Sequence, residues 1–116
     1  MSENGFSRLQ DLQALHWLRA VENKPGAAGI AALGRLPRLQ WADLGRCQVE
    51  AAWLRPLEGK CVKVLWLYNN PLGDSAMESL AKLPEIQELD VRGCGISKEG
   101  IERLPSKLTN TKVLVE

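Results

Sequence analysis

The sequence contains few of the residue types that catalysis, metal binding or disulfide formation require: it has one His, one Tyr, one Phe and three Cys in 116 residues. Three cysteines are an odd number, and no Cys-x-x-Cys pair occurs, so no disulfide framework and no zinc-ligand spacing are indicated. Reduced thiols in the cytoplasm or another reducing intracellular compartment are therefore expected. Because the single His16 has no Ser or Cys at a diagnostic spacing, we expect no enzyme activity, no metal site and no cofactor.

An excess of one charge and a long apolar run are also absent. There are 15 basic and 14 acidic residues, for a formal charge of +1, which predicts no long-range attraction to nucleic acid or to an anionic membrane. No apolar stretch reaches the roughly 18 residues of a membrane-spanning helix. The N-terminal MSENGFSRLQ has no basic segment followed by an apolar run, as a secretory signal would. With no nucleic-acid or membrane binding predicted, we expect the partner to be another protein.

A repeat runs through the chain instead. The segment VKVLWLYNNPL at 62–72 has apolar residues at its positions 1, 4 and 6, Asn at position 9 and an apolar residue at position 11. The same pattern recurs at 86–96, at 39–49 and, more loosely, at 15–25. We therefore predict repeats that start at residues 15, 39, 62 and 86, a partial repeat at 1–14 and a terminal strand at 111–116.

The stretches between these segments repeat as well. GAAGIAALGRLPR (26–38) aligns without a gap to GDSAMESLAKLPE (73–85), with an apolar residue at every third position. This spacing predicts short helices or 3₁₀ segments with one buried face. The stretches 50–61 and 96–110 are variants of the same pattern.

The motif LxxLxLxxN/CxL at this period resembles leucine-rich repeat proteins. The alternation of Asn and Cys at position 9 is similar to their intracellular, cysteine-containing and ribonuclease-inhibitor-like types, and is carried by Asn23, Cys47, Asn70 and Cys94. The resemblance covers roughly residues 6–116. It implies a single α/β domain, a leucine-rich repeat solenoid with parallel strands on the concave face and short helices or 3₁₀ segments on the convex face.

Stacking of such repeats predicts columns of like side chains in the core. Position 4 would supply one column, formed by Leu18, Ala42, Leu65, Leu89 and Leu114. The side chain at position 9 is expected to bond to backbone groups in the turn after each strand, where ladder partners are lost. We interpret these Asn and Cys residues as structural and not as metal ligands.

Positions 3, 5 and 7 of each strand point away from this core. Three of the four Trp residues and the only Tyr occur there, and we name this surface the Trp-rich face, defined by Trp17, Trp41, Trp66 and Tyr68. Charged residues would surround its aromatic centre: Arg19, Asp43, Glu88, Asp90 and Arg92, with Val113 and Val115 at the C-terminal end. An aromatic centre with a charged rim is typical of protein interfaces, so these four aromatic and five charged residues are our candidate partner-binding residues.

The sequence predicts a non-catalytic protein–protein interaction module, a scaffold or adaptor that binds through the Trp-rich face. Other hypotheses stay open. The aromatic side chains could serve only to stabilise the sheet through cross-strand packing. The chain could be an assembly subunit of a larger complex, or a homodimer, that makes contact through an uncapped edge strand at 111–116. It could also be the substrate-recognition part of a larger ligase or effector protein.

Overall fold

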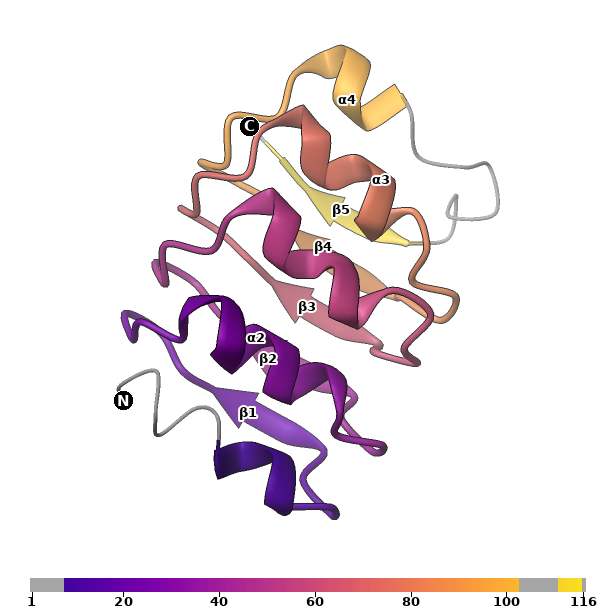
Figure 1. Cartoon of the computed structure of the whole chain (residues 1–116). Helices are drawn as coiled ribbons and strands as arrows, with labels where there is room; N and C mark the ends of the chain where they lie inside the picture. Colours follow the sequence, from indigo (N-terminus) through magenta and orange to yellow (C-terminus); the bar gives the residue numbers. More distant parts are fainter. Residues whose placement is uncertain (1–7, 103–110, 116) are drawn as a thin grey trace.

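The fold is mixed α/β and contains one parallel sheet. The computed structural model describes residues 8–102 and 111–115. Five strands pair in the order β1-β2-β3-β4-β5, so the chain crosses the sheet one strand at a time (Figure 1). Each strand has three residues: Trp17–Arg19 (β1), Trp41–Asp43 (β2), Val64–Trp66 (β3), Glu88–Asp90 (β4) and Lys112–Leu114 (β5).

Short helical segments alternate with the strands and lie on one side of the sheet (Figure 1). They are η1 (Arg8–Asp11), α2 (Gly26–Gly34), η2 (Ala51–Leu57), η3 (Asp74–Ala76), α3 (Met77–Leu80) and α4 (Lys98–Glu102). The prediction of short helices and 3₁₀ segments is confirmed for these residues. The segment η2 is entirely 3₁₀ and contains Pro56, whose ring nitrogen cannot donate an α-helical hydrogen bond. Our expectations for residues 1–7 and 103–110 lie outside the described residues.

Side chains on the helix side of the strands build the core in rows across the sheet. Leu18 pairs with Ala42, Ala42 with Leu65, and Leu65 with Leu89, and all four side chains are buried. A second row lies just beyond the strands and is equally buried: Ala20, Leu44, Leu67 and Val91. The predicted columns are therefore confirmed from β1 to β4. Trp53, in η2, is partly buried against this core.

The register that we predicted for the last strand is wrong by one residue. β5 pairs Val113 with Leu89 and Leu114 with Asp90. Val113 therefore packs against the core, and Leu114 takes the opposite face. Val115 lines a small cavity with Ile96 and Ile101, so it does not lie on the Trp-rich face either. Three consecutive apolar residues give no alternation to follow, and a slip of one residue exchanges the two faces of a strand.

The turn after each strand has a repeated backbone conformation. Position 8 has a positive φ in all four repeats, at Glu22 (64°), Arg46 (55°), Asn69 (57°) and Gly93 (69°). At Gly93 the absence of a side chain is also required, because a Cβ there would lie 2.1 Å from Oδ1 of Asn69. Each turn thus reverses the chain in the same way and directs it from the sheet toward the helical layer.

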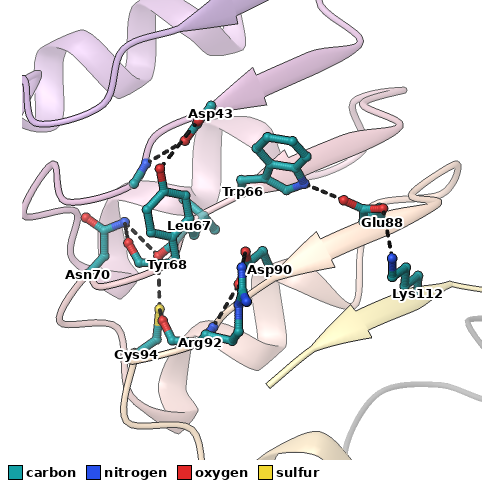
Figure 2. Close-up of polar contacts among 11 residues, drawn as sticks. Asp43, Trp66, Leu67, Tyr68, Asn70, Glu88, Asp90, Arg92, Cys94 and Lys112 are labelled. Carbon is teal, nitrogen blue, oxygen red and sulfur yellow. Dashed lines mark hydrogen bonds and ion pairs between the residues drawn. The ribbon is translucent and has the colours of Figure 1, made fainter. Parts of the chain in front are cut away.

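Asn70 connects the turns of two neighbouring repeats from a buried position. Its Oδ1 accepts hydrogen bonds from the backbone N–H groups of Cys47 and Val49, both at 3.0 Å. Its Nδ2 donates to the carbonyl oxygen of Leu44 at 2.9 Å. It also donates to the carbonyl oxygen of Leu67 at 2.7 Å (Figure 2). The structural role predicted for Asn70 is confirmed.

Cys47 and Cys94 occupy the same position as Asn70 but supply a single donor. Their Sγ atoms donate to the carbonyl oxygens of Ala20 at 3.0 Å and Leu67 at 2.9 Å, respectively. Burial raises the pKa of both thiols, which keeps them protonated and able to donate. Asn23, which is half-buried, donates to carbonyl groups of its own turn, to Ala20 at 3.1 Å and Val21 at 3.3 Å.

Candidate protein-binding surface

The side chains of the Trp-rich face surround one depression of about 510 Å³ on the side of the sheet opposite the helices. The predicted candidates all line it: Trp17, Arg19, Trp41, Asp43, Trp66, Tyr68, Glu88, Asp90 and Arg92. Leu114 completes the lining, and sequence reasoning missed it because of the register error in β5. The residues from β1 to β5 thus come together at one surface.

The three indoles of the Trp-rich face form a continuous cluster. Trp17 and Trp41 are paired residues of β1 and β2, and their rings stack with centroids 4.8 Å apart and planes 13° apart. Trp66 meets Trp41 edge-on, at 4.8 Å and 67°. Aromatic pairs of this kind contribute about 0.5–1.5 kcal/mol beyond the burial of their area. The aromatic rings therefore stabilise the sheet by packing across strands, but 52 % of Trp17 remains exposed to solvent.

Glu88 holds the Trp66 ring in place. Nε1 of Trp66 donates a 2.7 Å hydrogen bond to Oε2 of Glu88. Nζ of Lys112 lies 3.9 Å from Oε1 of the same carboxylate, which connects β3, β4 and β5 (Figure 2). Because the indole N–H is bonded within the protein, the orientation of the Trp66 ring is fixed by Glu88.

Tyr68 lies directly over the backbone of Gly45. A Cβ at residue 45 would lie 2.1 Å from Cζ of Tyr68, so the ring can occupy this place only above a glycine. The Tyr68 hydroxyl donates to Oδ2 of Asp43 at 3.5 Å. Burial raises the pKa of Tyr68, and the neighbouring Asp43 carboxylate raises it further.

The titration of Tyr68 can be followed in isolation because it is the only tyrosine. We expect the ultraviolet absorbance of its phenolate to appear above the ordinary pKa of about 10. The Asp43→Asn variant should titrate at a lower pH than the wild type but still above the unfolded chain, because burial remains.

A raised pKa of Tyr68 in the folded state means that the neutral phenol stabilises the fold. This stabilisation is complete below about pH 10 and is lost as the pH rises through the Tyr68 pKa. Equal midpoints in the wild type and Asp43→Asn would contradict the assigned contact.

Asp43 and Asp90 were expected among the charges at the rim of the Trp-rich face, and this expectation is wrong. Each is only 2 % exposed, because each carboxylate accepts the backbone N–H two residues ahead, at Gly45 and at Arg92, both at 3.1 Å. Guanidinium groups provide the compensating charge. Arg92 Nη2 lies 2.7 Å from Asp90, and Arg19 Nε lies 3.6 Å from Asp43. The recurrence of Asp at position 5, just before the turn, was the sequence signal for this role.

Across residues 8–102 and 111–115, no three His, Cys, Asp or Glu side chains gather as metal ligands would. Among the same residues, no helix is long and apolar enough to cross a membrane. The ring of His16 is exposed and lies 3.4 Å from the carbonyl oxygen of Ala14.

Comparison with known proteins adds information on the fold only. No family model matches the sequence, and no curated protein matches it. Among solved structures, the fold is similar to that of leiomodin-1 actin-binding site 2, with a TM-score of 0.68. The likeness covers 97 % of this chain and 78 % of that chain at 11 % sequence identity. At such an identity the likeness concerns the arrangement of strands and helices, not the function.

Proposed function

We propose that this chain is a leucine-rich repeat solenoid of one domain that acts as a non-catalytic protein-binding module through its Trp-rich face. The observation that carries the proposal is the half-exposed Trp17, which extends a cluster of three indoles into solvent. Exposed apolar patches with a polar rim mark interaction sites on soluble proteins. Trp, Tyr and Arg are also the residues that most often dominate binding energy.

The spacing of paired residues supports the leucine-rich repeat assignment. Trp17, Trp41, Val64, Glu88 and Lys112 pair in succession, at intervals of 24, 23, 24 and 24 residues. Each interval contains one strand and one helical segment, except that two consecutive segments, η3 and α3, follow β3. A unit of this size cannot bury its apolar side alone, so stability must come from contacts between neighbouring units.

The similar solved structure supports a protein as the class of partner. That structure is an actin-binding site of leiomodin-1, so a domain with this arrangement serves protein binding in that case. The low sequence identity carries no particular partner over to this chain.

The state of the polar groups supports a role without catalysis. Asp43, Asp90 and Glu88 are each engaged by hydrogen bonds and by Arg or Lys, so none is held ready for proton transfer to a substrate. The thiols of Cys47 and Cys94 donate hydrogen bonds, which requires their reduced form. This favours the cytoplasm or another reducing intracellular compartment.

Trp66→Ala should weaken partner capture by at least tenfold, about 1.4 kcal/mol, and leave the fold intact. The substitution removes the central ring of the depression while the core residues on the other side of β3 remain. The wild type and the variant would be immobilised and exposed to the same lysate, and the captured proteins quantified by mass spectrometry. The dissociation constant would then be measured for the most enriched protein.

Trp53→Ala is the matched control, because it removes a Trp that packs on the helix side of the sheet. Circular dichroism would establish that both variants are folded at the assay temperature. The control should capture the same proteins as the wild type. If Trp66→Ala unfolds, and no captured protein responds to any change in the Trp-rich face, the aromatic cluster is structural and the proposal fails.

A further inference from the structure

We propose that the segment recognised by the Trp-rich face is acidic: an extended stretch of polypeptide with a carboxylate on each side of an apolar residue. This inference rests on the proposed function, because it specifies the partner of the same surface. It follows from which charges of the depression a partner can reach.

Acidic and basic side chains are nearly equal in number around the depression, but the basic side chains are much more exposed to solvent. The side chains of Asp43 and Asp90 are each 3 % exposed. The side chains of Arg19 and Arg92, which neutralise them, are 67 % and 50 % exposed. A docking partner therefore meets guanidinium groups, while the matching carboxylates lie below the surface.

Glu88, the remaining acidic residue of the depression, is also less exposed than its basic partner. The Glu88 side chain is 26 % exposed and accepts the hydrogen bond of Trp66. The side chain of Lys112, next to it, is 67 % exposed. In each of these three ion pairs the basic side chain is therefore the more accessible one, although the formal charge of the chain is only +1.

The buried carboxylate of Asp90 also orients the guanidinium group of Arg92. Asp90 accepts hydrogen bonds from Nε of Arg92 at 3.0 Å and from Nη2 at 2.7 Å (Figure 2). A guanidinium that is held along one edge loses little side-chain entropy when it binds, and its planar fork matches the geometry of a carboxylate. Arg92 thus has the preorganisation of an anion-binding group, with half of its side chain accessible.

The separation of the two arginines determines the spacing of the acidic residues. Arg19 belongs to β1 and Arg92 follows β4, three strand spacings away, or about 14 Å across the sheet. An extended chain advances about 3.3 Å per residue, and residues i, i+2 and i+4 share one side. Carboxylates at i and i+4 would reach the arginines, and an apolar residue at i+2 would meet the aromatic cluster between them.

Single-stranded nucleic acid is also anionic and stacks on aromatic rings, but it fits this surface less well. Its binding depends on many phosphate contacts, and in the described part of the chain the depression and its rim offer three cations, Arg19, Arg92 and Lys112. Trp17 and Trp41 also stack on each other, so each already uses one ring face.

Selection from a random peptide library tests the proposal. The full chain would be immobilised and panned at low ionic strength against phage-displayed dodecapeptides, in parallel with the double variant Arg19→Gln/Arg92→Gln. The matched control is Arg38→Gln/Arg55→Gln, which removes the same charge from two exposed residues outside the depression. We expect the wild type and the control to enrich peptides with Asp or Glu at i and i+4 by at least tenfold, and the double variant to lose this enrichment.

A second measurement needs no variant of the protein. The most enriched peptide would be synthesised with its Asp and Glu residues intact, and again with Asn and Gln in their place. The wild type should bind the amide peptide at least tenfold more weakly. Its affinity for the acidic peptide should fall as salt is added, because the contacts lie at an exposed surface.

The outcomes separate this inference from the proposed function. Neutral or basic peptides that are enriched by the wild type and lost with Trp66→Ala would overturn the acidic partner and leave the proposed function in place. An absence of enrichment, or enrichment that Trp66→Ala does not change, would overturn both. Binding of oligothymidylate as tightly as the selected peptide would replace the acidic segment with nucleic acid.

Discussion

Asn70→Ala should lower the free energy of unfolding by about 3–5 kcal/mol, because two buried backbone N–H groups and the carbonyl group of Leu44 lose the Asn70 amide, and the carbonyl group of Leu67 keeps only the thiol of Cys94. Each buried polar group left unsatisfied costs about 1–3 kcal/mol, and the four shortest of the bonds of Asn70 are between 2.7 and 3.0 Å long. Because the bonds join two repeats, the loss extends beyond a single turn. Urea unfolding followed by tryptophan fluorescence would measure it.

Two other substitutions make this expectation specific. Asn70→Asp retains the acceptor for Cys47 and Val49 but replaces the NH₂ donor with an oxygen that faces two carbonyl groups, so this variant should be no more stable than Asn70→Ala. Asn23→Ala removes bonds to carbonyl groups in a half-buried turn and should cost about 1 kcal/mol. An Asn70→Ala protein no less stable than Asn23→Ala would show that water satisfies the turn and that the buried amide is not needed.

Gly45→Ala should cost about 1–3 kcal/mol in stability, the usual range for overpacking, and should weaken partner capture by at least tenfold. The added Cβ would lie between 2.1 and 2.6 Å from three ring atoms of Tyr68. The φ of Gly45 is not positive, so the backbone itself tolerates alanine. The ring must therefore swing outward, which breaks its contact with Asp43 and changes the shape of the depression.

A double-mutant cycle isolates this cause. In a Tyr68→Ala background the added methyl group meets no ring, so Gly45→Ala should there be close to neutral in stability. The two substitutions should thus show a coupling energy of about 1–3 kcal/mol. Additive effects would mean that residue 45 acts through something other than the Tyr68 ring.

Much of this surface could be predicted because the repeat fixes both the spacing and the facing of its residues. Once Leu65 and Leu67 are assigned to the core, the alternation of a strand places Trp66 and Tyr68 on the other side. The repeat interval then places Trp17 beside Trp41, and the stacked rings agree with this. The burial of Asn70 followed from the same reasoning, because backbone groups in a turn without ladder partners need a side-chain partner.

Other features of the Trp-rich face could not be predicted, because they depend on interactions that the repeat pattern does not specify. The burial of Asp43 and Asp90 results from backbone N–H groups and arginines that meet them only after folding. The side of the sheet on which Leu114 lies follows from its pairing with Asp90. The sequence alone does not indicate this side, because both neighbours of Leu114 are also apolar. The bond between Trp66 and Glu88 depends on the rotamers of two side chains on adjacent strands.

The register of the sheet gives the positions of each repeat different tolerances to substitution. Positions 4 and 6 pack against the adjacent unit. On the opposite face, position 5 carries the buried Asp43 and Asp90, which bond to the turn that follows, and position 7 carries Gly45, which leaves room for Tyr68. Position 3, where Trp17 is half-exposed, is therefore the place at which a substitution should change the surface with the smallest effect on the fold.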